Sequence, residues 1–123
     1  MKKLILSLLT AGLLLGATAT LRAGDEAPKT VIHVVTVSWK EGTTPEQIQA
    51  ALDGVKALPA NFKGIKRVWT KTVKAQGGKS HAFVMEFADE AALKEYSGSD
   101  AQKEWYKVYT PIRGSSTTFD ISN

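Results

Sequence analysis

Two histidines and a tyrosine are the residues of this chain whose types best suit proton transfer. His33 and His81 are its only histidines, and each lies in a stretch where apolar side chains recur at every second residue. Tyr96 lies three residues after Leu93 on the apolar side of a short helical pattern. Histidine is the usual general base of enzymes, so His33, His81 and Tyr96 are candidate catalytic residues that we expect to line one pocket. The alternative is that each histidine is a buried core residue bonded to the backbone or to tyrosine.

Other kinds of site have too few suitable residues. Two histidines without any cysteine, and with Glu86 on the opposite strand face, fall short of the three ligands of a typical catalytic zinc site. Gly77-Gly78 suits a hairpin turn and matches no dinucleotide- or phosphate-binding motif. We therefore expect no metal and no organic cofactor. The three tryptophans are interpreted as core or pocket-wall residues, namely Trp39, Trp69 and Trp105.

The elements that would position these residues follow from periodicity and from helix caps. Thr44, Asp89 and Ser99 are predicted N-caps, and Pro59 is predicted to end the first helix. A Gly-Gly turn joins the second and third strands as a hairpin. The predicted strands are residues 31–40, 64–74, 80–88 and 115–122. With the three helices, the order is β-α-β-β-α-α-β, which predicts an α+β, ferredoxin-like fold with an antiparallel sheet.

The N-terminus has the three parts of a secretory signal peptide. Lys2 and Lys3 are basic, residues 4–15 are almost all apolar, and Leu21-Arg22-Ala23 is a predicted cleavage site. The apolar run is shorter than the roughly 20 residues of a membrane-spanning helix, and an uncleaved anchor is the alternative. We predict a signal peptide over residues 1–23, a flexible lead-in over 24–30 and one domain over 31–123. The mature chain is then exported, periplasmic or secreted, with no stable membrane span.

Removal of the predicted signal peptide changes the charge of the chain. The whole sequence has 16 basic and 12 acidic residues, a net charge of +4. Lys2, Lys3 and Arg22 leave with the signal, so the mature chain has 13 basic and 12 acidic residues and a net charge of +1. A domain so close to neutral gives no electrostatic reason to expect nucleic-acid binding. The one basic cluster is interpreted as the solvated edge of a strand and comprises Lys63, Lys66, Arg67, Lys71 and Lys74.

The second face of the predicted sheet is too apolar to favour contact with water. Ile32 and Val34 in the first strand, and Ala82 and Val84 in the third, belong to that face. Burying each Ile or Val contributes about 1.5–3 kcal/mol, so two copies gain stability by pairing these faces. We expect a homodimer in which two sheets close into an α/β barrel, with a monomer as the alternative.

Two stretches of the chain carry a family resemblance. Residues 31–42, VIHVVTVSWKEG, are similar to the opening strand of the stress-responsive A/B barrel family, within the dimeric α/β barrel superfamily. Residues 80–89, SHAFVMEFAD, and the following residues 92–96, ALKEY, resemble the third strand and next helix of that family. The resemblance covers residues 30–122 and implies the ferredoxin-like fold and the dimeric barrel. It specifies no single function, because the family includes many proteins of undefined role.

One characterised branch of this family consists of plant polyketide cyclases, which use neither a metal nor an organic cofactor. The resemblance to them implies pocket roles for His33, His81 and Tyr96. The position of their catalytic histidine, near the helical segment, is occupied here by Gln102. An amide does not act as a base near neutral pH, so Gln102 argues against the aldol cyclisation of those enzymes.

Two functional hypotheses follow. The first is a homodimer that binds a small hydrophobic or aromatic molecule outside the cytoplasm. The second is a cofactor-independent lyase, cyclase, isomerase or monooxygenase that uses His33, His81 and Tyr96 on an aromatic or polyketide-like substrate. A purely structural dimer is a third alternative. A ligand-sized cavity lined by both histidines would favour the first two hypotheses, and a filled interior would favour the third.

Overall fold

The computed structural model describes residues 27–123, so the predicted signal peptide and the first part of the lead-in lie outside the described residues. The described elements are β1 (Val31–Trp39), α1 (Pro45–Asn61), β2 (Ile65–Trp69), β3 (His81–Phe87), α2 (Glu90–Tyr96), α3 (Asp100–Tyr109) and β4 (Arg113–Ile121). The predicted β-α-β-β-α-α-β order and the α+β fold class are confirmed.

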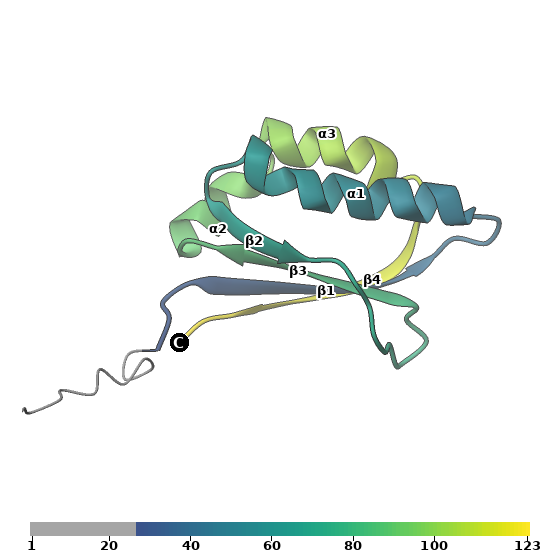
Figure 1. Cartoon of the computed structure of the whole chain (residues 1–123), viewed down its shortest axis with the longest axis horizontal. Coiled ribbons are helices and arrows are strands. Elements are labelled where there is room, and N and C mark those ends of the chain that lie inside the picture. The colour runs from purple at the N-terminus through teal and green to yellow at the C-terminus, as the bar shows by residue number, and fades with distance from the viewer. Residues whose placement is uncertain (1–26) are drawn as a thin grey trace, which may run out of the picture.

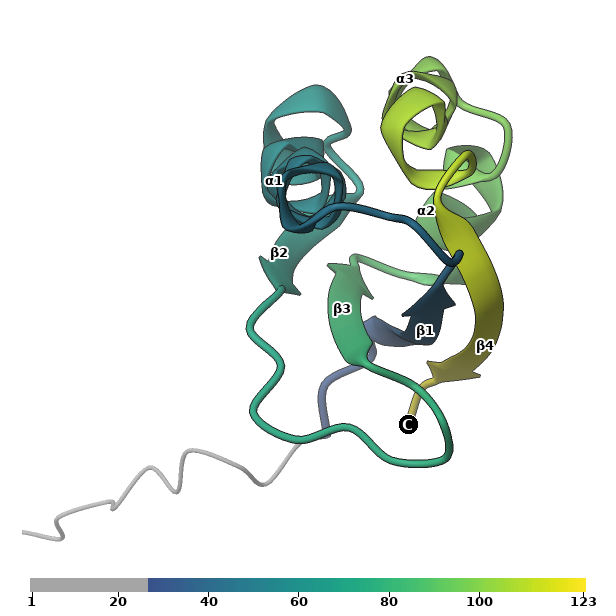
Figure 2. The same ribbon diagram turned by 90° about the vertical axis from the view of Figure 1, so that its right-hand side faces the viewer.

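The four strands form one antiparallel sheet in the order β2-β3-β1-β4. The strand β3 therefore lies between β1 and β2, as in the ferredoxin-like fold. The three described helices all lie on one face of the sheet, and none of them lies on the opposite face (Figure 1). Viewed along the helices, α1 lies above β2 and β3, and α3 lies above β4 (Figure 2). Any group that faces the helices from β1 or β4 therefore lies beneath α2 and α3.

The core lies between the sheet and the helices, as the period-two alternation predicted. On the strands, Val35, Val37, Phe83 and Met85 are at most 5% exposed. Helix α1 covers them with an apolar stripe, in which Ala51, Leu52, Val55 and Leu58 are buried. Side chains of this size stabilise a fold by about 1.5–3 kcal/mol each when fully buried.

Helix α1 begins where the capping pattern predicted, but it ends later. The Thr44 hydroxyl accepts the Gln47 N–H at 3.2 Å, and the Gln47 side chain accepts the Thr44 N–H at 2.9 Å. The prediction that Pro59 ends the helix is wrong, because the helix continues to Asn61. Proline lacks an N–H, but the next turn is closed by the Phe62 N–H, which donates to the Leu58 carbonyl at 2.9 Å.

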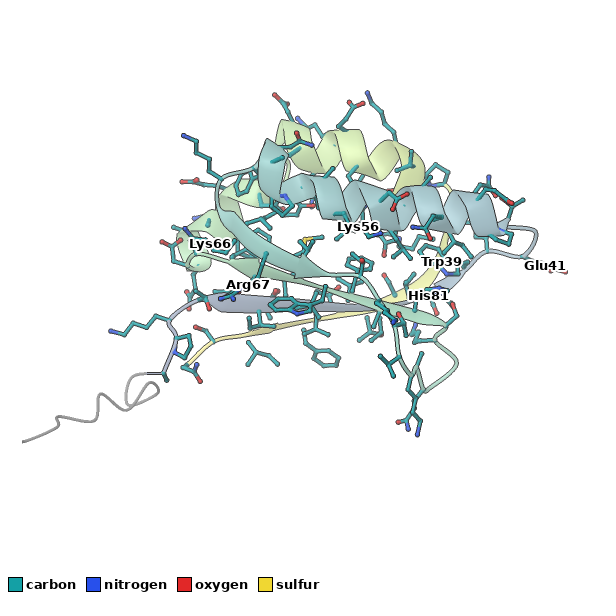
Figure 3. All side chains as sticks on the ribbon, viewed as in Figure 1. Trp39, Glu41, Lys56, Lys66, Arg67 and His81 are labelled. Carbon is teal, nitrogen blue, oxygen red and sulfur yellow. The ribbon has the colours of Figure 1, made fainter. Side chains whose placement is uncertain are left out.

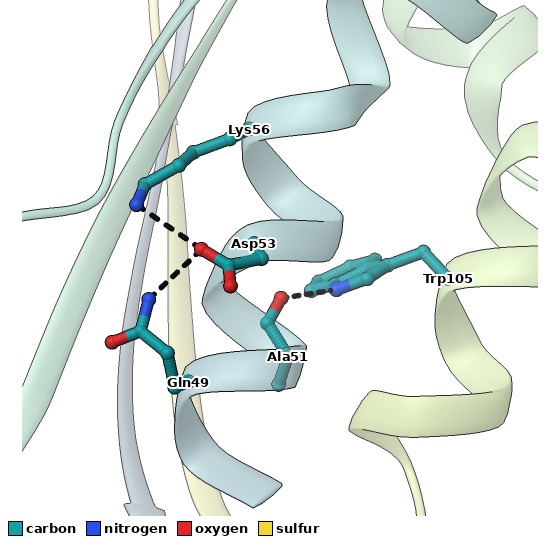
Figure 4. Close-up of polar contacts among 5 residues, drawn as sticks. All are labelled: Gln49, Ala51, Asp53, Lys56 and Trp105. Carbon is teal, nitrogen blue, oxygen red and sulfur yellow. Dashed lines mark hydrogen bonds and ion pairs between the residues drawn. The ribbon is translucent and has the colours of Figure 1, made fainter. Parts of the chain in front are cut away.

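Helices α1 and α3 are joined by one tryptophan. The Trp105 indole N–H donates to the Ala51 carbonyl at 2.9 Å (Figure 4). The nearby Asp53 carboxylate bonds only within α1, to Gln49 and Lys56. A Cβ atom on Gly54 would lie 2.5 Å from Trp105 Cδ1, so the absence of a side chain there lets the indole approach α1. Trp105 is 6% exposed, which confirms the prediction that it is a core or pocket-wall residue.

The connection between β2 and β3 is longer than predicted. Strand β2 ends at Trp69 and β3 begins at His81, so the prediction that the second strand continues to Lys74 is wrong. The Thr72 hydroxyl donates to the Ala82 carbonyl at 3.1 Å and accepts the Ala82 N–H at 2.9 Å. One side chain thus takes both backbone groups that a longer β2 would have paired. The predicted Gly-Gly turn is present, and both glycines have positive φ angles.

Strand β4 begins earlier than predicted and contains an irregularity. Val37 pairs with Ser116 and Trp39 pairs with Arg113, so β4 has one residue more than β1 in this interval. Two residues opposite one is the count of a β-bulge. A Cβ atom on Gly114 would lie 2.8 Å from the Ser38 carbonyl oxygen, so the backbones approach too closely for any other residue. The predicted start at residue 115 was wrong because Arg113-Gly114 has no strand pattern of its own.

The open face of the sheet is apolar in part and exposed. Phe119 and Ile121 on β4 are 57% and 58% exposed, and Ile32 and Val34 on β1 are half-buried. Trp69 on β2 is 49% exposed and is not a core residue, but it lines a pocket on this face together with Ile32 and Arg67. Strand β2 is short, and no described helix or strand covers the side chains that it places on the open face.

One charged group on this face is buried. Glu86 is 4% exposed, and its carboxylate pairs with the Arg67 guanidinium and accepts the Thr30 hydroxyl at 3.0 Å. The hydrogen bond from Arg67 holds the pKa of Glu86 below its usual range, although burial acts in the opposite direction. Arg67 and Lys66 are exposed on edge strand β2, as the solvated-edge interpretation of the basic cluster expects.

Candidate functional site

A cavity of about 330 Å³ lies between the sheet and helices α2 and α3. Ligand pockets commonly have volumes of about 300–1,000 Å³. One part of the wall is aromatic and consists of Phe83, Trp105, Tyr106 and Tyr109. Strands β1 and β4 add polar groups, namely His33, Arg113, Ser116, Thr118 and Asp120. Helix α2 and the residues after it contribute Leu93, Lys94, Tyr96 and Ser97, and α3 contributes Gln102.

His33 meets a carboxylate at one end of this cavity. Its Nδ1 atom lies 2.5 Å from Asp120 Oδ1, because β1 and β4 pair these two residues directly. An ionised carboxylate only accepts hydrogen bonds, so Nδ1 donates and Nε2 is the nitrogen left for a ligand. A histidine that a carboxylate orients in this way is a common form of general base. The side chain of His33 is 18% exposed and that of Asp120 is 44% exposed, so water reaches the pair from the Asp120 side.

Tyr96 lines the same cavity from helix α2. The residue is 3% exposed and its ring packs against Phe62 and Phe87, at centroid distances of 5.5 and 5.3 Å. Its hydroxyl is buried and has no hydrogen-bond partner among the described residues. Burial, with a smaller contribution from Tyr106, raises the pKa of Tyr96, so the hydroxyl keeps its proton at neutral pH. Tyr96 therefore lines the cavity and carries a buried hydrogen-bond donor without a partner among the described residues.

Both polar atoms of the Gln102 side-chain amide, Oε1 and Nε2, form hydrogen bonds in the cavity wall. The side-chain oxygen accepts the Gly98 N–H at 2.7 Å, and the side-chain nitrogen donates to the Tyr106 hydroxyl at 3.1 Å. Ser99 caps α3 by accepting the Gln102 N–H at 3.2 Å, but the amide reaches Gly98 and not Ser99. The predicted N-cap at Ser99 is thus present, without the reciprocal bond of a capping box. The amide positions Tyr106 and offers no basic atom.

His81 does not join His33 and Tyr96, so the expectation that all three residues line one pocket is wrong. His81 pairs with Val37, four residues along β1 from His33, which is about 13 Å at about 3.3 Å per residue. Its Nδ1 atom accepts the Trp39 indole N–H at 2.9 Å, and the two side chains lie together at the end of the sheet opposite the C-terminus (Figure 3). Trp39 in turn makes an edge contact with Tyr109, at 6.2 Å between ring centroids. This geometry favours the structural alternative for His81, which supports the cavity wall from behind.

Two residues of the cavity were missed by sequence reasoning. Asp120 lies 87 residues from its partner His33, and only the pairing of β1 with β4 brings the two together. Arg113 lies three residues before Ser116, so on a regular strand the two side chains would lie on opposite faces of the sheet. The bulge instead turns Arg113 toward the cavity. Strand alternation from Asp120 through Thr118 to Ser116 was the one available signal for the first residue.

Two negative findings apply to the part of the chain that the structure describes. Residues 27–123 contain no group of three His, Asp or Glu side chains placed to hold a metal ion. In the same range, no helix has both the length and the apolar character needed to cross a membrane.

The sequence of this chain is similar to a known protein family and to one of its plant members. The model of the Stress responsive A/B Barrel Domain family matches residues 31–123. Stress-response A/B barrel domain-containing protein HS1 of Arabidopsis thaliana is 29% identical over 89 residues, which cover 69% of this chain and 82% of that protein.

Solved structures give the same result at the level of the fold. A crystal structure of an Arabidopsis thaliana protein superposes with a TM-score of 0.68 and 25% identity, over 76% of this chain and 94% of that chain. A protein of unknown function from Bacteroides fragilis, described as dimeric and ferredoxin-like, superposes with a TM-score of 0.64 and 17% identity. That match covers 80% of this chain and 100% of the other. At this identity the second likeness shows the fold alone.

Proposed function

The chain belongs to the stress responsive A/B barrel domain family, and from this premise we propose that it binds a small hydrophobic or aromatic molecule in the cavity between the sheet and helices α2 and α3. The proposal extends to a homodimer formed through the open sheet face and to export of the mature chain. Proteins that share the fold are described as dimeric.

The Tyr96 hydroxyl is the observation that carries the binding proposal. A buried hydroxyl without a partner costs about 1–3 kcal/mol, and a fold rarely keeps one without a use. The hydroxyl is buried in a residue that lines a cavity with an aromatic wall, so a ligand with an apolar ring and a hydrogen-bond acceptor that reached this hydroxyl would satisfy both features. A neutral aromatic carbonyl compound such as benzamide is a suitable first probe.

Tyr96→Phe tests this proposal because it removes only the hydroxyl oxygen. We expect benzamide to bind the wild type, followed by chemical shift changes in ¹H–¹⁵N spectra, and to bind Tyr96→Phe about five- to tenfold more weakly. Thermal unfolding of the free variant should be unchanged or slightly raised in temperature, because no partner within residues 27–123 is lost. A matched control is Tyr106→Phe, which removes a hydroxyl that accepts the Gln102 amide N–H, so this change, unlike Tyr96→Phe, should lower stability. Equal benzamide affinity of Tyr96→Phe and wild type would contradict the proposal.

Export rests on the order of basic, apolar and cleavage-site residues at the N-terminus, outside the described residues. Sequencing the N-terminus of protein isolated from its host should return Gly24 as the first residue. Met1 in that position would contradict export by this signal.

A second candidate function, a cofactor-independent enzyme, is favoured by one specific observation. The carboxylate of Asp120 orients His33 at the edge of the cavity, with Nε2 available to a substrate. A neutral imidazole in this position can remove a proton from a carbon or hydroxyl of a bound aromatic compound. The reacting residues would then be His33 and Asp120, with Tyr96 as a hydrogen-bond donor.

A further inference from the structure

The bulge in β4 turns one arginine into the cavity. Ser116, Thr118 and Asp120 alternate along β4 and face the helices, so an undistorted strand would direct Arg113 to the open face. The extra residue between Ser116 and Arg113 reverses this direction, and Arg113 lines the cavity with the other three. Bulges often redirect a side chain beside a functional site. Gly114 makes the bulge possible, since any Cβ atom there would meet the Ser38 carbonyl.

The Arg113 guanidinium is held by aromatic rings and not by a carboxylate. Its Cζ atom lies 5.5 Å from the centroid of the Tyr109 ring, and Tyr109 is stacked on Trp105 at 4.4 Å with an angle of 8° between the rings. Within residues 27–123, Arg113 forms no ion pair with an acidic residue, whereas Arg67 is paired with Glu86. The Tyr109 ring therefore holds the guanidinium in the cavity wall, and no described carboxylate pairs with its N–H groups.

The charges around the cavity also favour an anion. Lys94 on α2 is the second cation of the described lining, and Asp120 is the one acidic residue there. The Asp120 carboxylate is bonded to His33. This pair and Arg113 lie at opposite ends of the paired segment of β1 and β4. The Arg113 end therefore has positive charge without a neutralising partner in the cavity wall.

We propose that the cavity selects a small aromatic carboxylate, with the ring against the aromatic wall and the carboxylate on the Arg113 guanidinium. This inference rests on the proposed function, because it names the ligand class of the same cavity. A planar carboxylate matches the fork of guanidinium N–H donors, and such charge-assisted bonds are stronger than those between neutral groups. The volume of about 330 Å³ suits a ligand with one or two rings.

Benzoate and benzamide form the matched probe pair, because they share a ring and a planar head group and differ in charge. Titrations followed in ¹H–¹⁵N spectra would give a Kd for each probe with wild type, Arg113→Gln and Lys103→Gln. Lys103 is exposed on α3 and does not line the cavity, so its replacement changes the net charge equally and serves as the control. We expect wild type and Lys103→Gln to bind benzoate about tenfold more tightly than benzamide, and Arg113→Gln to bind the two equally.

Each other outcome overturns a defined part of the argument. Equal affinity of wild type for both probes, or a benzoate preference that survives in Arg113→Gln, overturns the carboxylate assignment and leaves the proposed function standing. Failure of both probes to bind removes the support for the proposed function as well. Tighter binding of phenyl phosphate than of benzoate would overturn the choice of carboxylate. Arg113→Lys keeps the charge without the planar fork, so it should retain only part of the preference and replaces Arg113→Gln if that variant does not fold.

Discussion

In the cavity wall, the amide of Gln102 stands where the similar plant polyketide cyclases have their catalytic histidine. Gln102 is bonded to Gly98 and Tyr106 and has no basic atom, so it cannot accept a proton from a substrate near neutral pH. On the facing wall, His33 is oriented by Asp120 with its second nitrogen available. Of these two residues, therefore, only the strand histidine can act as a general base in this cavity.

Deuterium exchange at the α-carbon of acetophenone in D₂O tests this role for His33. If the chain has the second candidate function, wild type should accelerate the exchange, because an oriented imidazole removes the α-proton. His33→Gln should lower that acceleration by about 100-fold or more, within the range usual for loss of a general base. Asp120→Asn should lower it less, since the histidine loses its orientation but stays in place. The measurement is the loss of the methyl proton signal with time.

His81→Gln is the control, because His81 bonds to Trp39 and does not line the cavity. Exchange should be close to that of wild type in this variant. Exchange in His33→Gln as fast as in wild type would leave ligand binding as the only function supported for the cavity.

Only those site residues that local sequence patterns identify could be predicted from the sequence. Strand alternation identified His33, and helical spacing identified Tyr96 with Leu93, and these three residues do line one cavity. The same alternation misled at His81, because it gives the face of a strand but not the position along a neighbouring strand. Asp120 was missed for the same reason, since its role depends on the β1–β4 register.

At the scale of the elements, helix α1 was the most predictable, because its cap and apolar stripe are local features. Its end was not, since a proline two residues before the last helical residue is tolerated when a following N–H still finds its acceptor. The length of β2 depends on Thr72, whose hydroxyl occupies the backbone groups of Ala82. Such a contact depends on the fold, and no propensity of residues 64–74 predicts it.

Gly54→Ala tests how closely α1 and α3 are packed. Alanine is favoured over glycine inside a helix by about 1 kcal/mol, so an exposed site would gain stability. Here the new Cβ atom would lie 2.5 Å from Trp105 Cδ1 and 3.1 Å from Nε1, and overpacking costs about 1–3 kcal/mol. We expect Gly54→Ala to lower the free energy of unfolding by about 1–2 kcal/mol, as measured by urea denaturation.

The background variant Trp105→Leu separates the two effects, since it lacks the indole. In that background Gly54→Ala should raise the free energy of unfolding, because the helix preference remains and the close contact is gone. Stabilisation by Gly54→Ala in the wild-type chain would mean that α3 moves away from α1 at little cost.

At the scale of the whole molecule, the described residues 27–123 are one-sided, with their three helices on one face of the sheet and none on the other (Figure 2). The open face carries Phe119 and Ile121 at more than half exposure, beside the half-buried Ile32 and Val34. The connection between β2 and β3 extends past this face, and Val73 in it is 92% exposed (Figure 1). An exposed apolar surface of this kind is typical of an association surface in a small domain.

Val34→Lys tests the proposed dimer, because Val34 lies on the open face of the central strand β1. Two such faces in contact would remove the new ammonium group from water without a partner, which costs several kcal/mol. We expect wild type to sediment as a dimer and Val34→Lys as a monomer at the same concentration. Val108→Lys is the matched control, since Val108 is 42% exposed on α3, on the helical side of the molecule, and this variant should remain dimeric. If Val34→Lys also sediments as a dimer, the two copies associate through a surface other than the sheet.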